Sequence, residues 1–122
     1  DALPIFLIGE KTRLKVPELA TLELDLIRVK GKREPERIFV LLGNEEMAQS
    51  ALFKDWEEKH NLMLNQYRER QWDQSRKYAD QCLSIAGEGM KIYYHVFIAR
   101  LADMKKKPPP EGWDGVFVAQ TK

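Results

Sequence analysis

The sequence has 122 residues, of which 43% are hydrophobic, 32% charged and 10% aromatic, a composition typical of a globular protein and unlike that of disordered, collagenous or disulfide-rich chains. Its 20 basic residues nearly balance 19 acidic ones, so the net charge excludes a strong overall field for nucleic acid or anionic lipid. The length permits one domain, or two small units, but excludes two domains of ordinary size.

The first five residues are not expected to belong to the native protein. Residues 1–5 read Asp-Ala-Leu-Pro-Ile, which a common sequencing-adapter oligonucleotide encodes, so we expect a non-native lead-in and exclude it from the fold argument. The chain begins without Met, and we expect natural sequence upstream of residue 6. No apolar run approaches the ~20 residues needed to cross a bilayer, and no signal-peptide pattern opens the chain.

The first part of the chain carries strand patterns. Residues 5–8 form a short apolar run closed by Gly9, which predicts a strand buried on both faces. A short helix or turn is expected before Pro17. In residues 22–26 leucines alternate with acidic residues, the period of a strand with one face in water, and we expect this strand to continue through Val29.

A second strand is predicted over residues 37–42, after a polar connection that contains both Gly and Pro. The two strands are therefore expected to pair as an antiparallel hairpin. Glu23 and Asp25 fall on the wet face of the first strand and have no metal-ligand spacing, so we interpret them as solvated charges.

From Glu45 onward the apolar residues recur at the three-to-four spacing of a helix face. Three helical stretches are predicted: residues 45–70, 72–86 and 90–107. Their apolar positions are Leu52, Trp56, Met63 and Tyr67, with Phe53 and Leu64 alongside, then Ser75, Ala79, Cys82, Leu83 and Ala86, then Met90, Tyr93, Tyr94, Phe97, Leu101 and Met104. The first two stretches resemble one tetratricopeptide-type helix pair, which the third would cap.

The prolines at 108–110 cannot continue the third helix. The cations at 105–107 complement its negative end, and we interpret them as a solvated cap. The tail, residues 108–122, carries Trp113 and the apolar run Val116–Val118. We therefore expect the tail to dock on the folded chain.

Cysteine and histidine are too sparse to indicate a metal site. Cys82 cannot form an internal disulfide, and its place on an apolar helix stripe predicts a buried thiol in a reducing, cytoplasmic compartment. His60 and His95 have no cysteine or carboxylate at ligand spacing, so surface or packing roles are expected.

The predicted hairpin and the segments around it resemble the end of the catalytic domain of class III adenylate and guanylate cyclases. The downstream segments resemble the carboxyl-terminal extension of bacterial members that carry an extracytoplasmic sensor and membrane helices upstream. The matching segments are residues 7–12, 24–32 with the core Val29–Lys32, 35–43, 67–73 and 108–116. The resemblance thus covers nearly the whole chain.

This resemblance implies a homodimeric enzyme that converts ATP, or less often GTP, to a cyclic nucleotide and pyrophosphate. Two divalent ions, Mg²⁺ or Mn²⁺, would be held by paired aspartates and activate the ribose 3′-hydroxyl. Those aspartates, with the catalytic Asn and Arg, would precede residue 6. We therefore expect no catalytic or metal-binding residue in this chain, an inactive isolated chain, and a parent protein anchored in the membrane with this part in the cytosol.

The resemblance implies one site residue here, Lys30, which would contact the terminal phosphates of the nucleotide, with Lys32 as the second candidate. An ammonium beside Gly31 can approach phosphate oxygens without steric obstruction. On spacing alone, both lysines are better interpreted as solvated turn residues, and it is the resemblance to the family that favours a phosphate contact.

The sequence therefore predicts an α+β chain: residues 6–44 as the end of a cyclase catalytic domain, 45–107 as a three-helix, tetratricopeptide-like extension, and 108–122 as a Pro-rich docking tail. The alternative is a non-enzymatic helical-repeat module that binds another protein. Against it, the outward-facing positions carry charges typical of a solvated surface, Glu57, Glu58, Arg68, Arg76 and Lys77.

Overall fold

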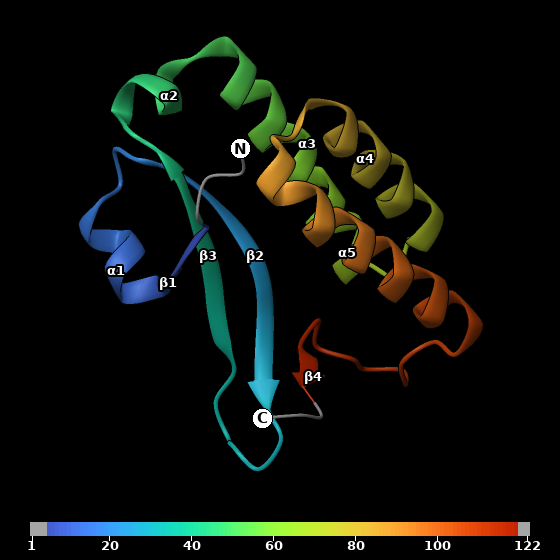
Figure 1. Ribbon diagram of the computed structural model, residues 1–122. Helices are drawn as coiled ribbons and strands as arrows, with labels where there is room; N and C mark the ends of the chain where they lie inside the picture. The colour runs from blue at the N-terminus through green and yellow to red at the C-terminus, as the bar shows by residue number, and fades with distance from the viewer. Residues whose placement is uncertain (1–4, 120–122) are drawn as a thin grey trace. The chain divides into compact units, whose positions relative to one another are not determined.

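The computed structural model describes residues 5–119 (Figure 1). The predicted lead-in, apart from Ile5, and the last three residues of the tail lie outside the described residues. The elements are β1 (Phe6–Gly9), α1 (Glu10–Lys15), β2 (Ala20–Val29), β3 (Glu36–Gly43), α2 (Glu45–Gln49), α3 (Ala51–Arg68), α4 (Trp72–Ile85), α5 (Glu88–Lys106) and β4 (Phe117–Ala119). The predicted α+β class is confirmed.

The described chain divides into two compact units. The sheet unit comprises residues 5–53 and 115–119, and the helical unit comprises residues 54–114. The chain passes from one to the other inside α3 and again after Asp114. This division differs from the boundary expected at residue 44, because α2 and the first turn of α3 belong with the sheet.

The sheet has the strand order β1-β3-β2-β4. The predicted antiparallel hairpin is confirmed, with β2 pairing with β3. At its centre Leu22 lies opposite Val40, and both side chains are buried. The parallel pairing of β4 with β2 adds a strand at the second edge of the hairpin.

A bulge interrupts the predicted alternation along β2. The register shifts between Glu23, opposite Phe39, and Asp25, opposite Ile38, so one residue is inserted relative to β3 and the strict period of two is lost. The interpretation of Glu23 as a solvated charge is wrong. Its side chain is only 17% exposed and accepts a 2.7 Å hydrogen bond from the Arg37 guanidinium.

The prediction that β1 is buried on both faces is also wrong. Among the described strands β1 pairs only with β3, so it lies at an edge of the sheet, and Phe6 and Leu7 are 59% and 61% exposed. A short apolar run does not distinguish a central strand from an edge strand, because the difference lies in pairing with distant segments.

The expected short helix is α1, and its side chains lie close to those of β3. The Arg13 guanidinium lies 5.7 Å from the centre of the Phe39 ring, a distance typical of a cation–π contact. The carboxylate of Glu10 lies 3.9 Å from the Arg37 guanidinium.

The first predicted helical stretch is split at Ser50 into α2 and α3. Ser50 has extended backbone angles, and its hydroxyl accepts a hydrogen bond from the Phe53 N–H at 3.1 Å, as a helix N-cap does. Asn44 caps α2 through the Met47 N–H at 3.0 Å. Met47 also packs against Gly43, which ties α2 to the end of β3.

The helical unit contains most of α3 and all of α4 and α5, close to the three predicted stretches. Most of the predicted apolar positions are buried, although Leu52 is 63% exposed and the stripe begins at Phe53 instead. The buried side chains of this unit are Trp56, His60, Met63, Leu64, Tyr67, Ser75, Ala79, Cys82, Met90, Tyr94, Phe97 and Leu101.

The Tyr94 hydroxyl is the centre of a buried polar network. The Trp56 indole N–H donates to it at 2.7 Å, and Nδ1 of His60 lies 2.8 Å away. An indole can only donate, so the Tyr94 oxygen accepts from Trp56 and keeps its own proton for another partner. Burial raises the pKa of Tyr94 far above its ordinary value, so the hydroxyl stays protonated.

We predict that Tyr94→Phe destabilises the helical unit by about 1–3 kcal/mol, because it removes the oxygen that Trp56 and His60 contact in a buried site. Urea unfolding followed by tryptophan fluorescence measures the change. Tyr78→Phe is the matched control, since the Tyr78 hydroxyl makes no hydrogen bond within the described residues. Equal stability of the two variants would contradict the prediction.

Gly43→Ala should destabilise the sheet unit by about 1–3 kcal/mol, because the new methyl group would overlap the Met47 side chain, including its Cβ at 3.1 Å. Gly9→Ala is the control, since nothing lies within 4 Å of the position that its Cβ would occupy. Chemical denaturation of both variants measures their free energies of unfolding. If Gly9→Ala loses as much stability as Gly43→Ala, the contact with Met47 is not the cause.

Candidate functional site

Lys30 lies directly after β2, in the connection that joins the two strands of the hairpin. The backbone N–H of Lys32 donates to the carbonyl of Val29 at 2.9 Å, and Gly31 has a φ of +91°. This left-handed conformation favours glycine. Lys30 and Lys32 therefore flank a tight turn on the exposed end of the hairpin.

Both lysine side chains are exposed, and their charges have no ion-pair partner among the described residues. Within residues 5–119 neither ammonium group makes an ion pair or a hydrogen bond, and no atom lies within 4 Å of the open side of Gly31. Arg33 follows in the same exposed connection. The turn can therefore offer uncompensated positive charge to an anionic oxygen.

The backbone of Lys30 makes a hydrogen bond with the tail of the chain. Its N–H donates to the carbonyl of Ala119 in β4 at 3.2 Å, which extends the parallel β2–β4 pairing by one residue. This contact joins the predicted site residue to the tail of the chain. Sequence reasoning missed it, because nothing in the tail indicates which strand it pairs with.

No metal centre is evident in the described part of the chain, where no group of three or more His, Cys, Asp or Glu side chains could hold an ion. The Asp25 carboxylate accepts the Leu26 N–H at 3.0 Å. His60 is buried beside Tyr94, whereas His95 is exposed on α5. The two histidines thus have the packing and surface roles expected of them.

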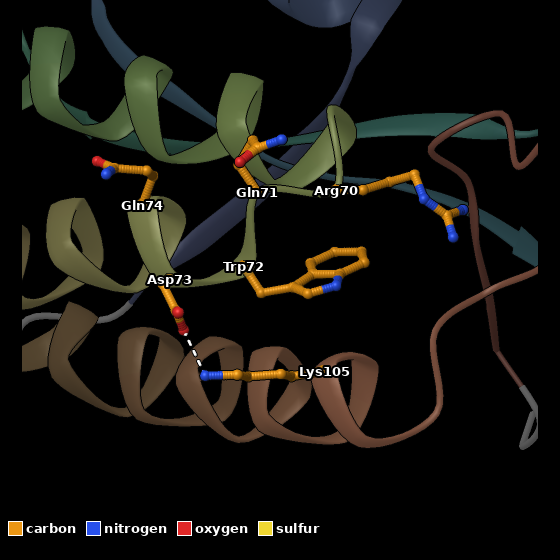
Figure 2. A pocket seen from close by; sticks show the side chains of 6 residues that line it. All are labelled: Arg70, Gln71, Trp72, Asp73, Gln74 and Lys105. Carbon is orange, nitrogen blue, oxygen red and sulfur yellow. Dashed lines mark hydrogen bonds and ion pairs between the residues drawn. The ribbon is translucent and has the colours of Figure 1, made fainter.

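The helical unit has a pocket of about 360 Å³ where the α3–α4 turn meets the end of α5. Figure 2 shows the side chains of Asp73 and Lys105 pointing toward each other, and their charged atoms are 2.8 Å apart. Both side chains stay largely exposed, so the ion pair lies at the surface and agrees with the interpretation of Lys105 as a solvated end of α5. The pocket is lined by Arg70, Gln71, Trp72, Asp73, Gln74 and Lys105.

The expected docking of the tail is confirmed, and Arg70 is the residue that sequence reasoning overlooked. Its guanidinium donates to the carbonyls of Pro109 at 2.8 Å and Pro110 at 3.1 Å. Arg70 also has a φ of +65°, which is rare for a residue with a side chain and marks a tight turn between α3 and α4. The only sequence signal was its position at a predicted helix end.

An aromatic cluster holds the same segment of the tail. The Trp113 ring lies edge-on to Tyr67, with centroids 5.2 Å apart, and 6.0 Å from Trp72. Tyr67 in turn packs against Phe97 at 5.0 Å. The Arg100 guanidinium lies within 5.7 Å of both of these inner rings. Such contacts add to the stability supplied by area burial alone.

The predicted charged face of the helices is only partly solvated. Glu58, Arg76 and Lys77 are exposed, and Arg76 makes an ion pair with Asp80 one turn further along α4. Arg68 is half-buried instead. Exposed helix pairs of this kind contribute a few tenths of a kcal/mol to stability.

The predicted burial of Cys82 is confirmed, since its side chain has no exposed surface. Burial raises the pKa of the thiol from an ordinary 9.0 to about 11, although a hydrogen bond with Tyr94 acts in the opposite direction. A neutral, enclosed thiol is a poor nucleophile. Cys82 is therefore a packing residue.

Comparison of the chain with family models, with curated proteins and with solved structures finds no match. None of the described helices is both long enough and apolar enough to cross a membrane.

The pKa of Cys82 predicts a pH dependence of stability. A thiol whose pKa rises on folding binds its proton more tightly in the folded state, so stability falls as the pH rises from 9 toward 11. Urea titrations across this range should show a steeper loss for the native chain than for Cys82→Ala. If the free energy of unfolding falls equally with pH in both proteins, the prediction is contradicted, since the other groups that titrate at alkaline pH are present in both.

Proposed function

We propose that this chain is the carboxyl-terminal part of a class III nucleotide cyclase, in which Lys30 contacts the terminal phosphates of ATP or GTP. The observation that supports this best is an exposed lysine, without an ion-pair partner in the described chain, on the shoulder of a β-hairpin beside Gly31. The order of strand, hairpin and helical extension is the one that the sequence resemblance implies.

The chemistry of the turn suits a triphosphate. A lysine ammonium is a compact charge with three donors, and its flexible stem lets it follow a moving phosphate. Because no carboxylate within residues 5–119 neutralises Lys30, phosphate binding would not have to displace an internal partner. Lys32 and Arg33 would add to the local positive potential.

The other catalytic parts would come from the rest of the parent enzyme. Two divalent ions held by paired aspartates would activate the ribose hydroxyl and stabilise charge on the α-phosphate. The parent would be a homodimer, anchored in the membrane with this part in the cytosol. The helical unit would be a tetratricopeptide-like extension that braces or regulates the catalytic dimer.

A second candidate is a non-enzymatic helical-repeat module that binds another protein. The observation that favours it is the pocket beside Trp72, which combines an aromatic ring with charged groups of both signs. In that case substitutions at the pocket would abolish partner capture, whereas substitutions in the hairpin would have no effect.

The test of the cyclase proposal is Lys30→Ala in the protein encoded by the complete open reading frame. Loss of a charge-assisted contact worth about 1.5–3 kcal/mol should lower kcat/KM for the nucleoside triphosphate by about 10- to 100-fold. Initial rates of cyclic nucleotide formation with Mg²⁺ or Mn²⁺ measure this change.

Lys32→Ala is the matched control, and we expect its kcat/KM to stay within about threefold of the native value, because only Lys30 is assigned a phosphate contact. The proposal fails if the complete protein makes no cyclic nucleotide, or if the reading frame encodes further helical repeats in place of a domain with paired aspartates. It also fails in its assignment of Lys30 if the two variants lose equal activity.

A further inference from the structure

We infer that the pocket beside Trp72 is a docking site for an extended, proline-rich segment of a partner protein. The pocket lies within the helical unit, since its lining residues come from the α3–α4 turn, the first turn of α4 and the end of α5 (Figure 2). This inference goes beyond the proposed cyclase and does not rest on it. It gives a ligand class to the second candidate function, the helical module.

The lining of the pocket carries hydrogen-bond donors that the described chain does not use. The Trp72 indole N–H donates to no atom within residues 5–119, and an indole nitrogen cannot accept. The side-chain amides of Gln71 and Gln74 also have no partner there, and each carries two N–H donors. Arg70 uses two of the five N–H donors of its guanidinium on the tail. The pocket therefore suits a ligand that is rich in acceptors.

The charges of the pocket disfavour an anionic ligand. The ammonium of Lys105 is already paired with the carboxylate of Asp73 at 2.8 Å. Arg70 is the remaining cation of the lining, and it donates to neutral carbonyl groups. A phosphate or carboxylate in the pocket would meet the Asp73 carboxylate as well as the two cations, and like charges repel. The acceptors that fit best are therefore neutral ones, such as backbone carbonyls.

A proline-rich segment combines these properties. Each proline offers a backbone carbonyl but no N–H, so the segment accepts hydrogen bonds without bringing donors that need acceptors. Its polyproline II conformation has no internal hydrogen bonds, which leaves every carbonyl accessible. The proline rings would pack on the half-buried Trp72 ring, as they do in aromatic-lined grooves that recognise such segments.

The tail of this chain already contacts the same side chains in this way. Arg70 donates to the carbonyls of Pro109 at 2.8 Å and Pro110 at 3.1 Å, and the Trp113 ring lies 6.0 Å from the Trp72 ring. Arg70 and Trp72 thus hold a proline segment of their own unit while they also line the pocket. Only two residues separate α5 from Pro109, so the tail stays in place and the partner segment would lie beside it.

The test is an NMR titration of the isotope-labelled 122-residue chain with a capped proline oligomer of about ten residues. The signals of the Trp72 indole N–H and of the Gln71 and Gln74 side-chain amides should shift and saturate, with a Kd on the order of 100 µM. The indole signal of Trp56 should not shift, because its N–H already donates to the buried Tyr94 hydroxyl.

Trp72→Phe keeps an aromatic ring beside Tyr67 and Trp113 but removes the indole N–H, so its Kd should rise about tenfold. Tyr78→Phe is the matched control, since Tyr78 is an aromatic residue of α4 that does not line the pocket, and its Kd should equal the native one. A capped glycine–serine oligomer of the same length has an N–H at every residue and a flexible backbone. It should bind at least about tenfold more weakly than the proline oligomer.

The inference is overturned if the proline oligomer causes no saturable shift of the pocket signals, or if Trp72→Phe or the glycine–serine oligomer leaves the Kd unchanged. It is also overturned if inorganic phosphate shifts these signals where the proline oligomer does not, since the pocket would then be an anion site. None of these outcomes involves cyclic nucleotide formation, so failure of docking and failure of the cyclase assay are separate results.

Discussion

The antiparallel pairing of β2 with β3 is the constraint on which the sheet unit depends. Both other strands attach to it, β1 along β3 and β4 along β2, and the exposed lysines lie in the turn that it creates. The buried pair Leu22 and Val40 keeps its register, because a slip of one residue would move these side chains to the opposite face. The bulge after Glu23 then brings this carboxylate to Arg37.

The helical unit is organised around two aromatic groups with different properties. Around Tyr94 buried hydrogen-bond contacts with Trp56 and His60 accompany the packing of the Tyr93 ring. A satisfied network of this kind favours one arrangement of the helices over alternatives. Around Tyr67 ring packing extends to Trp113, and the Arg100 guanidinium donates to the Tyr67 hydroxyl at 3.3 Å. The second group therefore extends the helical packing to a segment that is not helical.

The proposed function rests on the turn that joins β2 to β3. The hairpin offers positive charge and backbone order, and no metal-binding cluster is found in the described residues. In the proposed cyclase, this chain would contribute binding and positioning, while the bond-making chemistry would belong to the metal ions of the parent protein. Such contributions matter because phosphoryl chemistry depends chiefly on alignment and charge stabilisation.

Features that depend on neighbours along the chain were predictable from the sequence: the hairpin, the limits of α4 and α5, and the apolar helix stripe that contains Cys82. Their signals are periodicity, capping residues and turn residues, which act within a few positions. Three further features are seen in the folded structure alone: β1 is an edge strand, Arg70 binds the proline carbonyls, and β4 pairs beside Lys30. Each of these joins segments about 30 to 90 residues apart, and local patterns carry no information about which distant partner a strand or side chain will meet.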